Sequence, residues 1–428
     1  MQITFKDYVK SFPKIEKELD GQAMCAMKWI YSYVHLGDGV AKGCHNVPHR
    51  YVSHQDVITY GKDIFVNHPY EIERRNDKLK NIKHKECQAC WDSENKGVRS
   101  CRLPEPYYKM HQTRFGVNDT FTVMPTMIEI AFNNTCDLKC IYCSSAFSSQ
   151  WETEDKKFNV FAERQTTAPN GFADSFWQWL EEDAVDSLLQ YYILGGEPII
   201  QPEFYDFLDK LIPLLKRRPN KFGVKPQLVI LTNGNTPEKY LKKWFDKVKE
   251  LNEVITVQFH ISVEGFESRA EYIRTNLDWN RFSTNVDKIL QFSKLTDIRF
   301  SITHSVMSIT SCLDLLKWIK LLKDKHNVEV DLIRTSVSNP AHLAPWMLTL
   351  DFKMYIDEVC SWINNCAPEW QSYNEFLLGL ANSFGNHTTE DLKKFNVWEQ
   401  DMFNRRGLDI STIFPEMKTW IAYSRYEN

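Results

Sequence analysis

Three cysteines in the first half of the chain have the spacing of ligands to a small metal centre. Cys136, Cys140 and Cys143 form a C-x3-C-x2-C pattern directly after the alternating apolar run Met127–Phe132. Structural zinc sites and ordinary ferredoxin clusters are normally held by four protein ligands. Three thiolates therefore leave either an iron with an open position, where chemistry can occur, or a zinc site completed by a distant Cys or His.

This spacing, with the aromatic Tyr142 just before the last cysteine, closely resembles that of the radical SAM superfamily. The resemblance implies that the three cysteines hold a 4Fe-4S cluster whose open iron is chelated by S-adenosylmethionine. It also implies that one electron, supplied by a donor such as flavodoxin or ferredoxin, splits this cofactor to a 5'-deoxyadenosyl radical. That radical takes a hydrogen atom from the substrate.

A second set of cysteines lies in the N-terminal region. A strand-like stretch that opens at Cys25 is followed by a turn at residues 37–40, so that one hairpin brings Cys25 and Cys44 near each other. After basic helical sequence, Cys87 and Cys90 supply a C-x2-C pair. Four thiolates could therefore meet, and on geometry alone a tetrahedral zinc ion suits them as well as an iron-sulfur cluster.

The chain continues from this pair as Trp91-x2-Glu94-x2-Gly97-x2-Ser100-x-Arg102. The whole arrangement resembles the twitch domain, a shortened SPASM domain that carries an auxiliary 4Fe-4S cluster in many radical SAM enzymes. The auxiliary ligands that the resemblance implies are Cys25, Cys44, Cys87 and Cys90. Two features depart from the family pattern. The domain precedes the barrel instead of following it, and Cys101 adds a thiol that we interpret as free and structural.

From Met127 onward, strand-like runs alternate with amphipathic helical sequence, which predicts an α/β fold of βα units. Six such units resemble the partial (β/α)6 TIM barrel of the radical SAM core, in which chemistry takes place at the loops leaving the strand C-termini. The predicted strands are Met127–Phe132, Tyr191–Leu194, Gln227–Leu231, Ile255–Val263, Ile298–His304 and Val328–Ile333.

The sequence Gly195-Gly196-Glu197-Pro198 follows the second predicted strand. Glycines let the backbone approach a ligand closely, and a neighbouring carboxylate adds negative charge for an ammonium group. The resemblance implies that Gly195, Gly196 and Glu197 hold the amino group of the cofactor's methionine moiety.

Further polar residues follow the third and fourth predicted strands. Asn233, in Thr-Asn-Gly, presents an amide at the barrel mouth. Ser262 and Glu264 lie two apart on a β-segment and so point to one face, where a ribose diol is a natural partner. In relatives this position contributes to the ribose contact, often with Asp in place of Glu264.

Arg274 is a candidate for the carboxylate of S-adenosylmethionine, because a guanidinium matches a carboxylate bidentately; a surface arginine on a helix is the alternative. The loop at residues 337–343 resembles the segment that packs beside the adenine ring, with Tyr142 on the other side of that ring.

Composition restricts the class of protein. The 428 residues are 43% hydrophobic and 13% aromatic, with a net charge of -4, and no apolar run approaches the length needed to cross a bilayer. The N-terminus lacks the apolar segment of a secretory signal, so we expect a cytoplasmic protein with no membrane partner, whose eleven cysteines are available to metals. The negative charge argues against general nucleic-acid binding.

We expect three parts: a small α+β twitch domain at 1–110, a radical SAM core at 120–343 and a helical C-terminal extension at 344–428. We interpret Cys312, Cys360 and Cys366 as buried small hydrophobic residues. The tryptophans of the extension are interpreted as helix-packing core; they are Trp346, Trp362, Trp370, Trp398 and Trp420.

Three functional hypotheses follow. Many relatives with this auxiliary domain act on peptides or proteins, so the resemblance favours a peptide side chain as substrate. A small metabolite or nucleotide is the second hypothesis, and it predicts a closed pocket over the barrel mouth. The third is a non-enzymatic zinc or iron-sulfur scaffold, whose bound metal would not react with S-adenosylmethionine.

Overall fold

The structure is a computed structural model that describes residues 3–4, 23, 25–95, 100, 102, 123–160 and 167–426. The positions predicted at Gly97 and Cys101 lie outside these ranges. The chain divides into two compact units. Unit 1 comprises residues 1–135, 160–231 and 244–258, and unit 2 comprises residues 136–159, 232–243 and 259–428.

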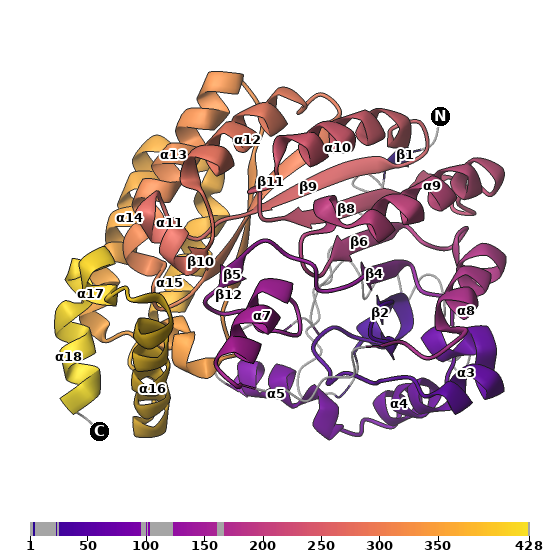
Figure 1. The fold of residues 1–428 in the computed structure, drawn as a ribbon, viewed down its shortest axis with the longest axis horizontal. Helices are drawn as coiled ribbons and strands as arrows, with labels where there is room; N and C mark the ends of the chain where they lie inside the picture. Colours follow the sequence, from indigo (N-terminus) through magenta and orange to yellow (C-terminus); the bar gives the residue numbers. More distant parts are fainter. Residues whose placement is uncertain are drawn as a thin grey trace. The chain divides into compact units, whose positions relative to one another are not determined.

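Within the described residues, eight strands form one mixed, mainly parallel sheet with flanking helices, in the order β12-β11-β9-β8-β6-β4-β2-β3 (Figure 1). This is the α/β architecture of a partial TIM barrel that the alternating pattern predicts. The bounds are β2 Tyr31–His35, β3 Val40–Lys42, β4 Met127–Ala131, β6 Gln190–Leu194, β8 Gln227–Thr232, β9 Thr256–Ser262, β11 Thr296–His304 and β12 Asp331–Ser336.

The six predicted barrel strands are all present, and only the last is displaced, by three residues. Helix α13 (Cys312–His326) ends at Asn327, which adopts a left-handed conformation with φ +51°. The backbone N–H of Val328 then bonds back to the Lys323 carbonyl at 3.2 Å, so Val328 completes the helix end and the strand begins at Asp331.

The N-terminal hairpin in unit 1 forms as predicted, but it belongs to the main sheet. Strands β2 and β3 pair antiparallel, and β2 also pairs parallel with β4 over the register Tyr31 to Met127 through His35 to Ala131. The residues before β2, predicted as strand, form the short helix α2 (Met27–Ile30) instead. Pairing between β4, β6 and β8 is parallel throughout.

The helices of unit 1 follow the amphipathic pattern. In α9 (Pro202–Arg217), proline occupies the first turn, where its missing N–H costs nothing, and Phe204, Phe207, Leu208 and Leu211 are buried. A short parallel pair, β1 (Ile3–Thr4) with β7 (Val224–Lys225), lies in the same unit. The other helices in the described part of unit 1 are α3 His54–Tyr60, α4 Pro69–Leu79, α5 Gln88–Asn95 and α8 Phe172–Trp179. Helix α10 (Glu238–Leu251) has residues in both units.

Unit 2 contains a short antiparallel pair, β5 (Lys139–Cys140) with β10 (Arg274–Thr275). Its helices, besides α13, are α7 Ser149–Lys157, α11 Ser268–Ile273, α12 Trp279–Gln291, α14 Lys353–Cys366, α15 Gln371–Ala381, α16 Thr389–Arg406, α17 Ile410–Ile413 and α18 Lys418–Tyr426.

The C-terminal extension is helical, as predicted, with Trp370 and Trp420 in its core. Trp346, Trp362 and Trp398 are only partly buried. Cys312 and Cys360 are buried as expected, but the prediction for Cys366 is wrong, because this cysteine is exposed. Cys366 is the last residue of α14, six positions from Cys360, so the two thiols cannot share the buried face of the helix.

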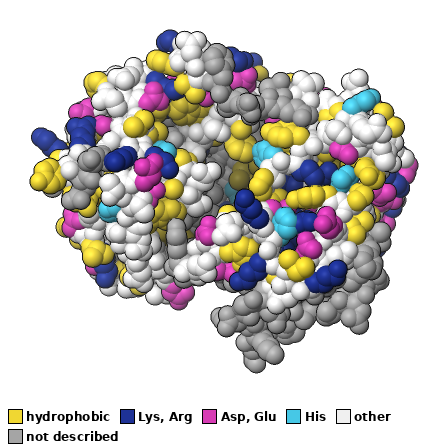
Figure 2. Space-filling model, turned by 90° about the horizontal axis from the view of Figure 1, so that it is seen from below, with side chains coloured by type: hydrophobic (Ala, Val, Ile, Leu, Met, Phe, Trp, Pro, Cys, Tyr) yellow, Lys and Arg dark blue, Asp and Glu magenta, His cyan; other side chains and the backbone are white. Residues whose placement is uncertain are grey.

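None of the described helices is long and apolar enough to cross a membrane. On the visible face in Figure 2, acidic and basic side chains are interspersed, in keeping with the small net charge.

Candidate functional site

The loop that carries Cys136, Cys140 and Cys143 lies in unit 2, where a short strand pair holds it. Cys140 is paired with Arg274 in the β5–β10 ladder, and the next backbone N–H, of Ile141, bonds to the carbonyl of Ile273 at 2.9 Å. The chain then turns, with the N–H of Cys143 bonded to the carbonyl of Cys140 at 3.0 Å. The backbone of the loop is therefore set by a segment more than 130 positions further along the chain.

The first turn of α7 fixes the same loop from another side. The Ser149 hydroxyl accepts from the N–H of Cys136 and donates to its carbonyl, both at 3.2 Å. The indole N–H of Trp151 donates to the carbonyl of Cys140 at 2.9 Å. These side chains therefore hold the carbonyls of Cys136 and Cys140 in place.

Asp137, between the first two cysteines, accepts hydrogen bonds from three asparagine side-chain amides. Its carboxylate accepts from the amide of Asn233 at 2.6 Å and from that of Asn235 at 3.0 Å, and its carbonyl accepts from Asn276 at 3.3 Å. The Thr-Asn-Gly turn predicted at the barrel mouth is thus tied to the cysteine loop. In this structure the Asn233 amide binds Asp137, which makes Asn233 a positioning residue for the loop.

Arg274 lies beside the cysteine sulfur and is paired with a buried carboxylate. Its guanidinium donates to both oxygens of Glu264, at 2.5 and 2.6 Å, to the Tyr142 hydroxyl at 2.8 Å, and to Cys140 Sγ at 3.7 Å. Glu264 and Arg274 are both buried. To bind a cofactor carboxylate, Arg274 would have to share its guanidinium between that carboxylate and Glu264. To contact a ribose, Glu264 would likewise have to share its carboxylate between the ribose and Arg274.

Burial dominates the electrostatics of this group. It raises the pKa of Cys140 to about 12, although the neighbouring Arg274 cation acts to lower it. A thiol of this kind loses its proton only when a strong positive partner, such as an iron centre, binds the sulfur. Ser262, at the end of β9, is partly exposed in the same unit.

The glycine turn after β6 belongs to unit 1 and tolerates no side chain. Gly195 has φ +86° and Gly196 has φ +62°, a region that favours glycine. A Cβ on Gly196 would lie 2.2 Å from the carbonyl oxygen of Thr135. Glu197 is fully buried, and its N–H bonds to that same carbonyl at 2.8 Å. The turn therefore packs directly on the end of the segment that follows β4.

The Gln201 side chain secures this packing. Its amide nitrogen donates to the carbonyls of Gly195 at 2.9 Å and Thr135 at 3.0 Å. Sequence reasoning missed Gln201, because a glutamine before a helix is an ordinary residue. It also missed Asp137 and Trp151, although the position of Asp137 between two cysteines was an available signal.

The four N-terminal cysteines are buried in unit 1. Cys44 and Cys87 pack in one cluster with Ala23, Val47 and Trp91. Burial raises the pKa of Cys25 to about 12, with Cys44 and Cys87 close enough to raise it further. The amide of Asn46, two residues after Cys44, lies 3.9 Å from Cys90 Sγ. The fold thus buries all four cysteines in unit 1 and brings Cys44 and Cys87 close to Cys25.

The residues of the motif after Cys90 also come together. Glu94 accepts from the Ser100 hydroxyl at 2.5 Å and from Arg102 Nε at 2.9 Å. The Arg102 guanidinium lies 4.4 Å from the centre of the Trp91 ring. One ion pair, between Glu94 and Arg102, thus places the Arg102 guanidinium on the tryptophan beside Cys90.

Among the described residues, no three His, Cys, Asp or Glu side chains form a group that could hold a single metal ion. A 4Fe-4S cubane binds each thiolate to a different iron, so its ligands need not converge on one point. The donor set fits a negatively charged iron-sulfur group at both places: the loop has partly buried thiols with a cation at Cys140, and the N-terminal set has buried thiols with a cation at Cys87.

Residues 130–309 match the family model described as the Radical SAM superfamily, which covers less than half of the chain. No curated protein matches the sequence.

Several solved structures resemble the fold at low identity. SuiB of Streptococcus suis bound to S-adenosylmethionine is 15% identical, with a TM-score of 0.36, over 80% of this chain and 71% of that chain. The native protein anSMEcpe with bound AdoMet is 15% identical, with a TM-score of 0.38, over 59% of this chain and 62% of that one. TYW1 with a lysine-pyruvate adduct bound is 16% identical, with a TM-score of 0.30, over 56% of this chain and 74% of that chain. Residues 130–309 are thus similar to the radical SAM superfamily, and this match, together with the cysteine loop described above, indicates an enzyme.

Proposed function

We propose that this enzyme cleaves S-adenosylmethionine reductively at a 4Fe-4S cluster held by Cys136, Cys140 and Cys143, and abstracts hydrogen from a peptide or protein side chain. The observation that carries the proposal is the cysteine loop itself. The backbone that carries the three thiols is held by the β5–β10 pair and by the first turn of α7. The Arg274 guanidinium lies 3.7 Å from Cys140 Sγ. A cluster held by these three thiolates would supply the electron for the sulfonium of S-adenosylmethionine and thereby the means to abstract hydrogen.

The remaining roles belong to side chains and backbone of the chain. Glu197 and the carbonyls of Gly195 and Gly196 would accept from the cofactor ammonium, because glycine at these two positive φ angles puts no Cβ in the way. Ser262 and Glu264 would contact the ribose, and Tyr142 would flank the adenine together with the loop at 337–343.

Arg274 has two tasks in this proposal. It neutralises Glu264 in a buried setting, and it places a positive charge at Cys140, which favours the thiolate that iron requires. A buried carboxylate left without this guanidinium would be strongly destabilising.

An auxiliary 4Fe-4S cluster at Cys25, Cys44, Cys87 and Cys90 is part of the proposal. It is supported by the shared burial of the four thiols and by the Glu94–Arg102 pair, which accounts for the motif after Cys90. We assign residues 1–110 to this auxiliary region, 120–343 to the radical SAM core and 344–428 to a helical extension. The peptide substrate follows from the likeness of this region to twitch domains. Free thiols and a low-potential donor such as flavodoxin or ferredoxin fit a cytoplasmic enzyme.

The test is anaerobic reconstitution with iron and sulfide, reduction with dithionite, and detection of 5'-deoxyadenosine after addition of S-adenosylmethionine. The full chain should bind about eight irons, four for each 4Fe-4S cluster. It should form the nucleoside, whereas Cys136→Ala should not.

Cys366→Ala is the matched control, because Cys366 is exposed and belongs to neither cysteine set. It should retain both the iron and the nucleoside. Equal nucleoside formation by Cys136→Ala and the parent chain would refute the assignment of the loop. Zinc in place of iron at the N-terminal cysteines would refute only the auxiliary cluster.

A further inference from the structure

One buried lysine in unit 1 has a cysteine sulfur as its hydrogen-bond acceptor. The ammonium of Lys78, near the end of α4, lies 3.2 Å from the Sγ of Cys87. Lys78 is 2% exposed, so water does not solvate this charge. Cys87 ends the 3-10 helix η2 (Lys85–Cys87) and is itself buried. An ammonium group thus points at one of the four proposed auxiliary ligands.

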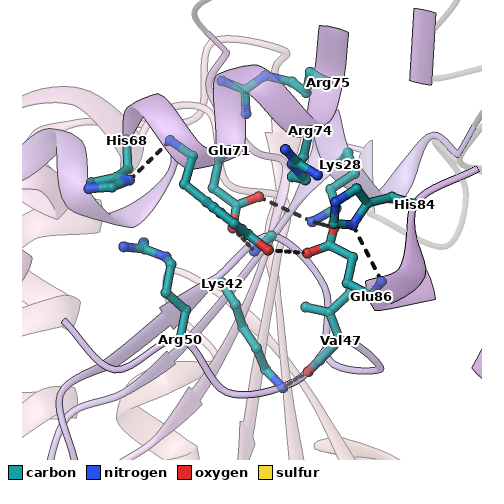
Figure 3. Close-up of polar contacts among 12 residues, drawn as sticks. Lys28, Lys42, Val47, Arg50, His68, Glu71, Arg74, Arg75, His84 and Glu86 are labelled. Carbon is teal, nitrogen blue, oxygen red and sulfur yellow. Dashed lines mark hydrogen bonds and ion pairs between the residues drawn. The ribbon is translucent and has the colours of Figure 1, made fainter. Parts of the chain in front are cut away.

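The other buried cations around this region bind oxygen. Figure 3 shows Lys28 between two carboxylates, with Glu71 Oε2 at 3.2 Å and Glu86 Oε1 at 2.9 Å. In the same view, Lys42 reaches the carbonyl of Val47 at 2.7 Å. The Arg75 guanidinium donates to the carbonyl of Val66 at 3.0 Å. Their charges are satisfied by oxygen atoms of the protein, and among the described residues of unit 1 Lys78 is the buried cation directed at a thiol.

Positive charge also gathers on the tryptophan that follows the C-x2-C pair. Lys78 Nζ and Lys83 Nζ each lie 5.1 Å from the centre of the Trp91 ring, and Arg102 Cζ lies 4.4 Å from it. Arg102 is paired with Glu94, and Lys83 is exposed to solvent. Lys78 is therefore the one of these three cations that is neither paired with a described carboxylate nor solvated.

A neutral thiol is a weak hydrogen-bond acceptor and does not offset the charge of a buried ammonium. A thiolate is a strong acceptor, and its negative charge does offset the ammonium. The hydrogen bond from Lys78 to Cys87 becomes stronger when this sulfur carries negative charge. Binding to iron provides that charge, because a metal-bound cysteine is deprotonated.

We propose that Lys78 tunes the auxiliary iron-sulfur cluster: its ammonium donates a charge-assisted hydrogen bond to the Cys87 thiolate and stabilises the reduced state of the cluster. The inference rests on the proposed auxiliary cluster and assigns a positioning residue to it. Reduction adds one negative charge to the cluster, and a buried cation at hydrogen-bond distance favours the more negative state. Lys78 therefore makes the auxiliary site a better electron acceptor.

The experiment uses the full chain with Cys136, Cys140 and Cys143 all changed to alanine, so that only the auxiliary site can hold a cluster. Iron, sulfide and zinc contents are measured first, and the midpoint potential is then obtained by an anaerobic redox titration followed by EPR. About four irons per chain are expected in this background. Zinc, or no metal, would refute the auxiliary cluster and with it the role of Lys78.

In this background, Lys78→Met should shift the midpoint potential to a more negative value, because it removes the charge and keeps an unbranched side chain over Trp91. Lys78→Arg should stay near the parent value, since it preserves the cation. The matched control is Lys83→Met, which removes a cation at the same distance from the same ring but exposed to solvent. Its potential should not change.

An unchanged potential in Lys78→Met at full iron content would overturn the proposal. Loss of iron in Lys78→Met with retention in Lys78→Arg supports it, because charge at this position then holds the cluster. Loss of iron in both variants, with Lys83→Met intact, would overturn it in favour of a packing role.

Discussion

The indole N–H of Trp151 donates a 2.9 Å hydrogen bond to the backbone carbonyl of Cys140, the central cysteine of the proposed catalytic loop. The ring of Trp151 is buried, and the guanidinium of Arg406 from the C-terminal helix α16 lies 5.1 Å from its centre. The extension thereby contributes to the environment of the cysteine loop within unit 2, through one tryptophan.

Trp151→Phe should reduce the iron that this loop retains after desalting, because the Cys140 carbonyl loses its donor and the loop gains freedom. The hydrogen bond is worth about 1 kcal/mol. Trp420→Phe is the control, since it removes an equivalent indole bond, to the Met347 carbonyl at 3.1 Å, among the C-terminal helices. It should lower stability by a similar amount with full iron content. The loop assignment would be contradicted if both variants lost iron equally.

Gly196→Ala should prevent stable folding of the turn after β6. The new Cβ would meet the Thr135 carbonyl oxygen at 2.2 Å, and alanine at φ +62° adds about 1 kcal/mol or more of strain. Gly379→Ala, in helix α15, has nothing within 4 Å of its new Cβ and should stabilise by roughly 0.5 to 1 kcal/mol. Thermal unfolding followed by circular dichroism compares the two, and equal melting temperatures would argue against the tight packing of the glycine turn.

The stability of the metal-free protein should fall as pH rises through neutrality because of Glu129 on β4. Burial raises the pKa of this carboxyl to about 7, which outweighs the opposing effects of the Tyr31 hydroxyl and Lys42. Because the pKa of this carboxyl is higher in the folded than in the unfolded chain, the protonated group adds to the free energy of unfolding. This contribution is fully present below pH of about 4.5 and is lost as the pH rises to about 7. It amounts to on the order of 3 kcal/mol.

Glu129→Gln should remove this dependence. Melting temperatures between pH 5 and 7.5 would show it as a flatter profile for the variant than for the parent chain. Parallel profiles would mean that Glu129 is ionised throughout this range.

Substitution by methionine at two adjacent arginines of α16, Arg405 and Arg406, should change the melting temperature in opposite directions. All three guanidinium nitrogens of Arg406 are buried and have no hydrogen-bond partner among the described residues. Arg406→Met keeps the packing on Trp151 and removes buried guanidinium nitrogens that lack hydrogen-bond partners, so the metal-free protein should melt at a higher temperature.

Arg405 pairs with Asp155 at 2.9 Å and Asp401 at 2.8 Å, with its side chain 5% exposed. Arg405→Met should therefore lower the melting temperature, since it leaves two carboxylates without their partner. A drop in both variants would show that Arg406 is compensated in solution.

Local features of the fold and the site could be predicted from the sequence alone. Alternating apolar residues predict each barrel strand, because side-chain period depends only on neighbours along the chain. The spacing of Cys136, Cys140 and Cys143 likewise predicts a metal-binding loop by itself, and Gly195 and Gly196 indicate a turn that excludes side chains. These signals lie within a few positions of one another.

Only the tertiary structure decided which distant residues complete them. Arg274 reaches Cys140 across 134 positions, Gln201 reaches Thr135 across 66, and β2 joins the sheet beside β4 with no sequence signal for that pairing. Lys78 acquires its acceptor only when α4 packs against Cys87. Cysteine spacing is a property of the local chain, whereas the charge beside each sulfur depends on burial and long-range packing, which no local pattern records.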